Sequence, residues 1–288
     1  MPELPEVETV RRGLAPVLAG ARIVRAEARR PDLRFPFPER FAQRLAGARA
    51  QTVERRAKYL LAGLDTGQTW VTHLGMTGRF LVERGGEGGE APGRYARAAP
   101  AEQKHAHLLL ETDAGIRITF FDARRFGYMG LIPTAELASH PWFADLGPEP
   151  LGPEFDAPRL LAGFAGRRQA VKTVLLDQRV VAGLGNIYVC EALHRAGISP
   201  KKPAGKVGRA AAARLVEAIR AVLGDAIEAG GSTLRDYASA EGLSGLFQHS
   251  FAVYGREDEP CPRMSCSGVV RRYVQGGRST FGCSACQR

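Results

Sequence analysis

The chain has 288 residues, enough for two domains, and its 44% hydrophobic residues can fill their cores, which excludes wholesale disorder. No apolar stretch approaches the roughly 18 to 20 residues needed to cross a bilayer, and acidic residues stand where a secretory signal would be basic, so we expect a cytoplasmic protein. The net charge of +10 favours a polyanionic partner, because phosphate neutralisation by Lys and Arg releases counterions. Charge alone leaves this open, since an Arg-rich coding composition gives the same excess.

The first segment, MPELPEVE, predicts a helix beside an unusual N-terminal group. Pro5 suits a first helical turn, and apolar residues recur at spacings of three and four: Val7, Val10, Leu14 and Val17. Removal of Met1 would expose the secondary amine of Pro2 at the start of this helix. From spacing alone, Glu3 and Glu6 would simply cap the helix and offset its dipole.

Short runs of β character follow, separated by Gly and Asp turn signals, over 21–29, 51–64, 69–83 and 106–132. They predict an antiparallel sandwich or barrel in a domain spanning 1–133. The Gly-, Ala- and Pro-rich stretch 83–103 has no periodicity and is expected to be a loop without a chemical role.

After a proline-rich linker, 134–152, the pattern changes to helical periods over 159–168, 170–181, 186–197 and 208–230. We expect a helical domain over 153–250 and a separate tail over 251–288. The fold class is therefore α+β, with a change of class midway along the chain.

The tail has a cysteine pattern, C-x4-C-x16-C-x2-C, that is typical of a tetrahedral zinc site. The predicted ligands are Cys261, Cys266, Cys283 and Cys286. Between the two pairs, two β runs flank Gly276 and Gly277, which predicts a hairpin with Arg278 near its tip. The segment could be a purely structural ribbon or a DNA-contacting finger, and Cys190, among apolar residues, is expected to be a buried thiol.

In their order along the chain, the stretches PELPEVETV, HLGMTG, DARRFG, LLDQRVVAGLGNIY and VYGRE, with the four cysteines, resemble the bacterial formamidopyrimidine-DNA glycosylases. The resemblance covers nearly the full chain and implies an N-terminal β-sandwich with flanking helices, then a helix-two-turn-helix domain with a zinc-finger hairpin. Two departures are visible. The first cysteine pair encloses four residues instead of the usual two, and Arg168 stands where the family usually has Lys, which keeps the charge but changes its geometry.

The resemblance implies a bifunctional glycosylase and AP lyase that removes 8-oxoguanine and formamidopyrimidines opposite cytosine and then cleaves the strand by β,δ-elimination. Pro2 would be the nucleophile, because its amine leaves an iminium that acidifies the neighbouring C2′ proton. Glu3 would transfer protons, with Glu6 supporting it. Lys58 would approach the sugar or its 3′ phosphate, and Arg278 would contact phosphate and assist the second elimination.

The resemblance also assigns contacts to duplex DNA. Those to the backbone would come from His73, His105, Arg168 and Asn186. The gap left by an extruded base would be filled by Met76, Arg124 and Phe126. Without the resemblance, Met76 and Phe126 would be read as core residues, Asn186 as a helix cap, and the histidines and cations as ordinary surface or core groups.

Two alternatives stay open: an oxidised-pyrimidine glycosylase of the endonuclease VIII type, which typically begins with PEGPE, and a lesion-binding protein without catalysis. We expect one structural Zn²⁺ per chain, damaged double-stranded DNA as the partner, no membrane, a monomer, and association with the nucleoid during action on DNA. Lesion specificity is expected to depend on a loop around 230–248.

Overall fold

The computed structural model describes residues 2–84, 100–232 and 246–288. The chain divides into two compact units, the first formed by Met1–Ala144 and Ala229–Leu246 and the second by Asp145–Glu228 and Phe247–Arg288. Residues 229–246, placed by sequence in the helical domain, thus group with the first unit. Most of the Gly-rich stretch and of the expected specificity loop lie outside the described residues.

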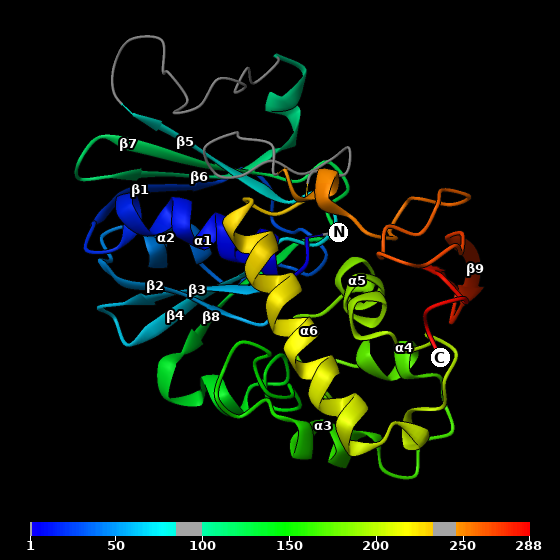
Figure 1. Ribbon diagram of the computed structural model, residues 1–288. Coiled ribbons are helices and arrows are strands. Elements are labelled where there is room, and N and C mark those ends of the chain that lie inside the picture. The colour runs from blue at the N-terminus through cyan, green and yellow to red at the C-terminus, as the bar shows by residue number, and fades with distance from the viewer. Residues whose placement is uncertain (1, 85–99, 233–245) are drawn as a thin grey trace. The chain divides into compact units, whose positions relative to one another are not determined.

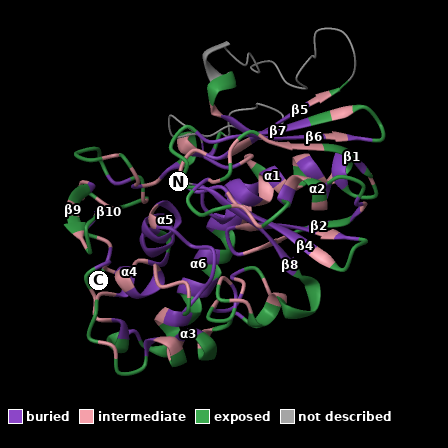
Figure 2. Cartoon of the chain, turned by 180° about the vertical axis from the view of Figure 1, so that it is seen from behind, coloured by how far each residue is buried: buried purple, intermediate pink, exposed green. Residues whose placement is uncertain are grey.

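The first unit contains two antiparallel four-stranded sheets, with strand orders β1-β6-β7-β5 and β2-β3-β4-β8. The strands are β1 (Ile23–Ala28), β2 (Ala50–Arg56), β3 (Tyr59–Leu64), β4 (Gln68–His73), β5 (Arg79–Arg84), β6 (Ala106–Thr112), β7 (Ile116–Phe121) and β8 (Tyr128–Pro133). The helical elements are α1 (Leu4–Leu18), α2 (Phe41–Leu45), and the 3-10 helices η1 (Pro100–His105) and η2 (Thr134–Ser139). Figures 1 and 2 show the sheets as two layers with α1 and α2 at a level between them, which confirms the predicted sandwich with flanking helices.

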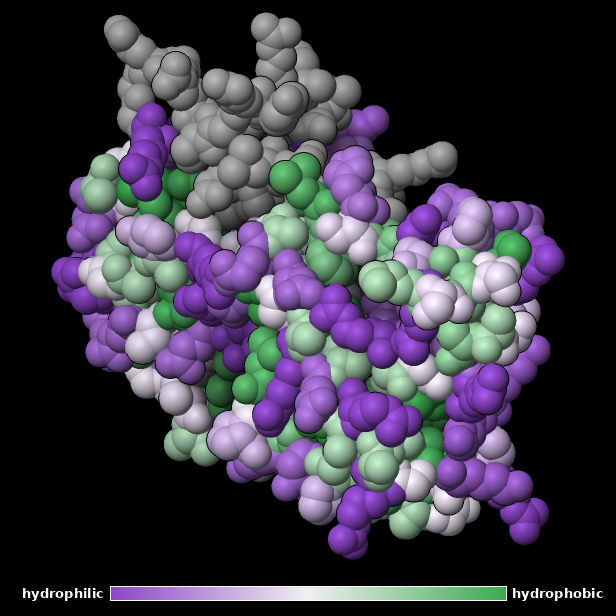
Figure 3. Space-filling view, in the orientation of Figure 1, coloured by the Kyte–Doolittle hydropathy of each residue, from purple (hydrophilic) through white to green (hydrophobic). Residues whose placement is uncertain are grey.

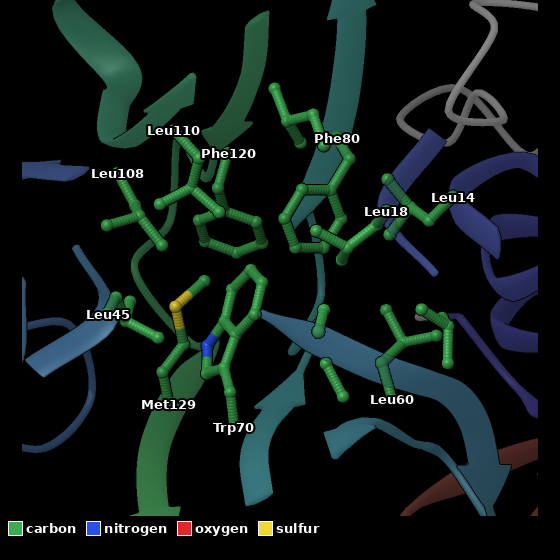
Figure 4. Packing of buried hydrophobic residues seen from close by; sticks show 14 of the residues in the cluster. Leu14, Leu18, Leu45, Leu60, Trp70, Phe80, Leu108, Leu110, Phe120 and Met129 are labelled. Carbon is green, nitrogen blue, oxygen red and sulfur yellow. The ribbon is translucent and has the colours of Figure 1, made fainter. Parts of the chain in front are cut away.

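The core of the first unit lies between the two sheets and α1. Trp70 and Met129 come from one sheet and face Phe80 and Phe120 from the other (Figure 4). The predicted apolar stripe of the first helix joins this cluster: Val7, Val10, Leu14 and Val17 are all buried. The hydrophobic periodicity of the first helix therefore predicted which face it buries.

The second unit is mainly helical and ends in a hairpin. Its elements are α3 (Ala157–Phe164), α4 (Val171–Leu175), α5 (Asn186–Ala196), η3 (Ala204–Lys206), α6 (Arg209–Glu228), η4 (Phe247–Ser250), β9 (Arg271–Gln275) and β10 (Arg278–Gly282). Helix α6 packs against α3 and α5, and α5 also packs against β10. The hairpin turns at Gly276 and Gly277, both with positive φ, as predicted.

Helix α4 is shorter than the helical pattern over 170–181 suggested. Asp177 ends it, because its carboxylate accepts hydrogen bonds from the backbone N–H of Arg179 at 3.1 Å and from the Arg179 guanidinium at 2.9 Å. Such a local side-chain bond competes with the helical ladder.

The surface is mixed in character. On the face shown in Figure 3, hydrophilic residues are interspersed with apolar ones. None of the helices in the described part of the chain combines the length and apolarity that a membrane span requires.

Candidate functional site

The N-terminal carboxylates are buried and hydrogen-bonded at the start of α1. Pro2 is buried, and Glu3 and Glu6 expose only 3% and 1% of their surface. Glu3 is the N-cap residue, and its backbone N–H donates to Oε2 of Glu6 at 2.8 Å, as part of a capping box. The capping role that spacing favours is therefore real, and it fixes the segment that follows Pro2.

Glu6 also binds a residue far along the chain. Its Oε1 accepts hydrogen bonds from the backbone N–H and the hydroxyl of Ser232, each at 2.9 Å. Gly231, with a φ of +80°, packs closely against Glu6, since an added Cβ would lie only 3.2 Å from Oε1. Glu6 thus joins the first helix to residues at the start of the expected specificity loop.

The first turns of α1 are also fixed to β2. Glu8 lies 3.3 Å from Arg55 and 2.8 Å from Arg11, whose guanidinium reaches the carbonyl of Val53 at 3.4 Å. Burial alone would raise the pKa of Glu8, but the hydrogen bonds and charges of these arginines lower it below its ordinary value. These contacts place the end of the β2–β3 hairpin beside α1.

Lys58 lies in the two-residue turn of that hairpin and is only 8% exposed. The other turn residue, Ala57, has a φ of 52°, a conformation that costs energy for a residue with a Cβ. The Arg55 guanidinium donates to the Ala57 carbonyl at 2.8 Å and so supports this turn. A buried lysine in a strained turn differs from the generic surface cation that its sequence context suggests.

His73, the last residue of β4, is held as a neutral imidazole. Its Nδ1 lies 3.0 Å from the backbone N of Gly75 and accepts that hydrogen bond, while its ring stacks on Tyr128 at 4.8 Å. Burial, then the charges of Lys58 and Arg34, lower the pKa of His73 to about 3. The ring hydrogen is therefore on Nε2, which makes His73 a neutral donor rather than a cation. His105, at the end of η1, is half-buried.

The three residues assigned to gap filling are not core residues. Met76 is half-buried in the loop between β4 and β5, whereas Arg124 and Phe126 are exposed in the loop between β7 and β8, Phe126 by 44%. The Arg124 guanidinium lies over the Phe126 ring, 4.7 Å from its centroid. An exposed aromatic ring stacked with a cation suits contact with bases better than internal packing.

In the second unit, two side chains bind the backbone carbonyl of Ser279, the residue after Arg278. The Asn186 amide donates to the carbonyl of Ser279 at 2.9 Å, and Lys172 Nζ donates to the same carbonyl at 3.0 Å and to Thr280 Oγ1 at 2.7 Å. Asn186 does not cap α5, whose N-cap residue is Gly185. Arg278 itself is exposed at the start of β10, and Arg168 is exposed between α3 and α4.

Sequence reasoning missed Lys172, which is fully buried and whose pKa burial lowers. The signal was its position between Val171 and Val174, on an apolar turn where an unpaired cation would be costly.

Glu191 was also missed. It is 4% exposed and accepts three backbone hydrogen bonds, from Ala252 at 2.8 Å, Val253 at 3.0 Å and Tyr254 at 2.8 Å, which anchor the segment that leads to the cysteines.

The four predicted cysteine ligands come together, with all Sγ atoms within 4.8 Å of one another. Cys261 and Cys286 are 3.8 Å apart and Cys266 and Cys283 are 3.7 Å apart, so none is in a disulfide. A tetrahedron with Zn–S bonds of about 2.3 Å has sulfur–sulfur edges of about 3.8 Å, so the donor set fits zinc. Burial and the neighbouring Cys261 raise the pKa of Cys286 to about 12. Cys190 is buried, as expected.

The loop between the first two cysteines is docked on helix α5. Arg263, between Cys261 and Cys266, donates to the carbonyls of His194 at 2.7 Å and Arg195 at 3.0 Å. A guanidinium at a helix C-terminus satisfies unpaired carbonyls and the helix dipole. Arg263 therefore docks the cysteine loop on the end of α5, where His194 Nε2 also lies 3.3 Å from Cys261 Sγ.

Comparison with known proteins gives consistent matches over the whole chain. Residues 1–129 match the formamidopyrimidine-DNA glycosylase N-terminal domain, and residues 146–238 match the H2TH domain of the same enzymes. Proteins named formamidopyrimidine-DNA glycosylase from Phenylobacterium zucineum and from Caulobacter vibrioides strain NA1000 are 63% and 59% identical to it, with 100% of each chain covered.

Solved structures agree. The crystal structure of the MutM (Fpg) protein from Thermus thermophilus has a TM-score of 0.83 at 40% identity and covers 99% of this chain and 98% of its own. A Lactococcus lactis Fpg in complex with DNA that contains an abasic site has a TM-score of 0.86 at 33% identity, with full coverage of both chains. With both family domains, the predicted fold and the clustered cysteines, the chain belongs to the formamidopyrimidine-DNA glycosylase family.

Proposed function

We propose that this chain removes oxidised purines from duplex DNA through the amine of Pro2 and then cleaves the strand at the resulting site. Its family consists of DNA glycosylases with AP lyase activity that act in base excision repair. The observation that carries the proposal is the start of α1, where buried Pro2 is followed by two buried carboxylates held by backbone and Ser232 hydrogen bonds.

The amine of Pro2 suits both steps of the reaction. Its lone pair attacks C1′ of the damaged nucleoside, and the bond from C1′ to the base breaks, with the base leaving after protonation. Opening of the sugar gives an iminium, loss of the C2′ proton expels the 3′ phosphate, and a second elimination expels the 5′ phosphate. An α-amine has a reference pKa of roughly 8, so a useful fraction is neutral near pH 7 without strong perturbation.

The other groups take supporting roles in this proposal. Glu3 carries protons to the sugar oxygen and the leaving base. Glu6 holds Glu3 in place, because its carboxylate accepts a hydrogen bond from the backbone N–H of Glu3 at 2.8 Å. Lys58 and Arg278 bind the phosphates that flank the damaged nucleoside. Further contacts to the DNA backbone come from His73, His105, Arg168 and Asn186. Arg124 pairs with the orphaned cytosine, while Met76 and Phe126 replace the lost stacking.

The cysteines would hold one Zn²⁺, which when bound cross-links the tail and takes no part in the chemistry. The backing of β10 by Lys172 and Asn186 then keeps Arg278 directed outward. We also expect the chain to act as a monomer and to associate with the nucleoid only through DNA.

The decisive experiment is borohydride trapping on a duplex with one 8-oxoguanine opposite cytosine, followed by peptide mass spectrometry of the crosslink. A crosslink on Pro2 is expected, with weakened activity in Pro2→Gly, which keeps an N-terminal amine. A chain that retains Met1 should bind but not react, because its Pro2 nitrogen is an amide. A crosslink on Lys58 would contradict the mechanism, and a chain that binds but never crosslinks would be a lesion-binding protein.

Substrate class needs a separate measurement. A panel of duplexes with defined lesions should show faster cleavage of oxidised purines than of oxidised pyrimidines. The opposite ranking would assign the chain an endonuclease VIII type of specificity. Glu3→Gln should suppress base removal more than cleavage at a preformed abasic site, where no leaving base needs a proton.

A further inference from the structure

The residues proposed to fill the gap lie on two separate loops of the first unit. Met76 is on the loop between β4 and β5, and Arg124 and Phe126 are on the loop between β7 and β8. A wedge made from two loops can enter a base stack as one body only if their relative position is fixed beforehand, since ordering them on binding would cost conformational entropy.

One hydroxyl group joins the two loops. Thr77, next to Met76, donates its hydroxyl hydrogen to Oδ1 of Asp122 and accepts a hydrogen bond from the backbone N–H of Arg124 at 3.1 Å. The Thr77 hydroxyl therefore makes two hydrogen bonds to the opposite loop, one as donor and one as acceptor. The bond that it accepts comes from the backbone of Arg124, one of the residues proposed to fill the gap.

Asp122 fixes the other end of the same loop. It is fully buried, and its Oδ2 accepts a hydrogen bond from the backbone N–H of Gly127 at 2.7 Å, directly after Phe126. Its carbonyl lies 2.8 Å from Nε2 of buried His107, and its N–H donates to the His105 carbonyl at 3.1 Å. One aspartate thus holds the segment that carries Arg124 and Phe126 from both sides.

The backbones of the two loops are also in direct contact. A Cβ added at Gly75, where φ is +64°, would overlap the backbone of Phe126 and Gly127. Arg125, between the two wedge residues of the second loop, has a φ of 55°. Strain of this kind persists only where surrounding contacts fix the conformation, and Thr77 and Asp122 supply such contacts.

We propose that Thr77 and Asp122 are positioning residues that lock the two loops together, so that Met76, Arg124 and Phe126 enter the DNA as one preassembled wedge. This inference rests on the proposed function. Neither residue touches the reacting atoms, and their effect is on base extrusion and on recognition of the opposite base.

The test compares Thr77→Val, which keeps the shape but removes the hydroxyl, with Thr77→Ser, which keeps the hydroxyl. Single-turnover excision of 8-oxoguanine opposite cytosine should be about tenfold slower in Thr77→Val and close to wild type in Thr77→Ser. The preference for cytosine over adenine opposite the lesion should fall in Thr77→Val, because Arg124 is no longer held in place. Cleavage of a preformed abasic site, where no damaged base must be unstacked, should change by about twofold or less.

Thermal melting of each variant checks that the fold is kept. The inference is overturned if Thr77→Val excises the lesion and selects the opposite base like the wild type, or if abasic-site cleavage falls as much as excision. Failure of the proposed function gives a different result, since the wild-type chain itself would then show no borohydride crosslink and no excision.

Discussion

The start of α1 and the terminal hairpin support their proposed reactive groups in opposite ways. At α1, the functional carboxylates are themselves buried, and their oxygens accept hydrogen bonds from nearby backbone and from Ser232. At the hairpin, Arg278 is exposed. The buried group is Lys172, which donates to the backbone carbonyl of Ser279 and to the hydroxyl of buried Thr280, the next two residues along the chain.

The difference follows from what each group is proposed to do. A proton-transfer carboxylate has to stay at a fixed position beside the reacting atoms, so its own oxygens are held by hydrogen bonds inside the protein. A phosphate-binding arginine has to reach solvent-exposed DNA, so only its backbone can be fixed from inside the protein. Substitutions in the first region should therefore slow the chemistry, and substitutions in the second should weaken DNA binding.

The largest effect is expected from loss of the metal ligands. Cys283→Ala removes one of the four thiols and should lower zinc content and weaken DNA binding by about 100-fold, because structural zinc sites contribute folding energy directly. Elemental analysis and fluorescence anisotropy measure the two quantities. Cys190→Ala, at a buried thiol outside the cluster, is the matched control and should keep its zinc. Wild-type protein purified without chelator but lacking stoichiometric zinc would refute the metal site.

Substitution of Glu6 is expected to have a smaller effect, which changes the excision rate and not the DNA affinity. Glu6→Gln places an amide where the carboxylate accepts bonds from Glu3 and Ser232, so at least one donor would face another donor. Excision under single turnover should slow by about 30-fold with DNA affinity nearly unchanged. Glu8→Gln, whose partners are arginines, is the control and should slow it less. A loss of affinity in Glu6→Gln, without a loss of rate, would break the contrast between the two regions.

Sequence predicted the parts of this comparison that depend on local pattern. The apolar stripe of the first helix, the turn at Gly276 and Gly277, and the cysteine cluster all follow from spacing within short segments. These signals survive in the fold because the first two concern residues of one element or turn, and the cysteine pairs are brought together by the single hairpin between them.

The supporting residues could not be predicted in the same way. The partners of Glu6, Lys172 and Glu191 lie 226, 108 and 62 residues away in the sequence. No periodicity or motif within a segment carries information on such a pairing. The strained turn at Ala57 is likewise set by the packing around it, since alanine has no intrinsic preference for a positive φ.

A third effect, about tenfold on DNA affinity, is expected at Lys172. Lys172→Met keeps a long apolar side chain but removes the bonds to Ser279 and Thr280, so Arg278 would lose its fixed position. The slope of log affinity against log salt should fall by about one unit or less, as in Arg278→Ala, although Lys172 is fully buried. Lys206→Met, at an exposed lysine, is the control for charge alone. Equal effects of the two lysine variants would mean that Lys172 does not act through Arg278.

The smallest effect is on stability and tests the neutral state of His73. Its pKa is about 3 in the folded protein and roughly 6.5 in the unfolded chain, so between these values the unfolded state holds a proton that the folded state lacks. The stability that this difference contributes is complete above pH 6.5 and is lost as pH falls toward 3. His73→Gln removes the titrating group. The difference in unfolding free energy between wild type and variant, measured by urea unfolding at pH 7, 6 and 5, should therefore shift by about 1 kcal/mol per pH unit below pH 6. If the two proteins lost stability in parallel, the pKa of His73 would be the same in the folded and unfolded states, and its surroundings would not hold the ring neutral. That outcome would also set His73 apart from Glu3 and Glu6, whose positions are fixed by buried hydrogen bonds.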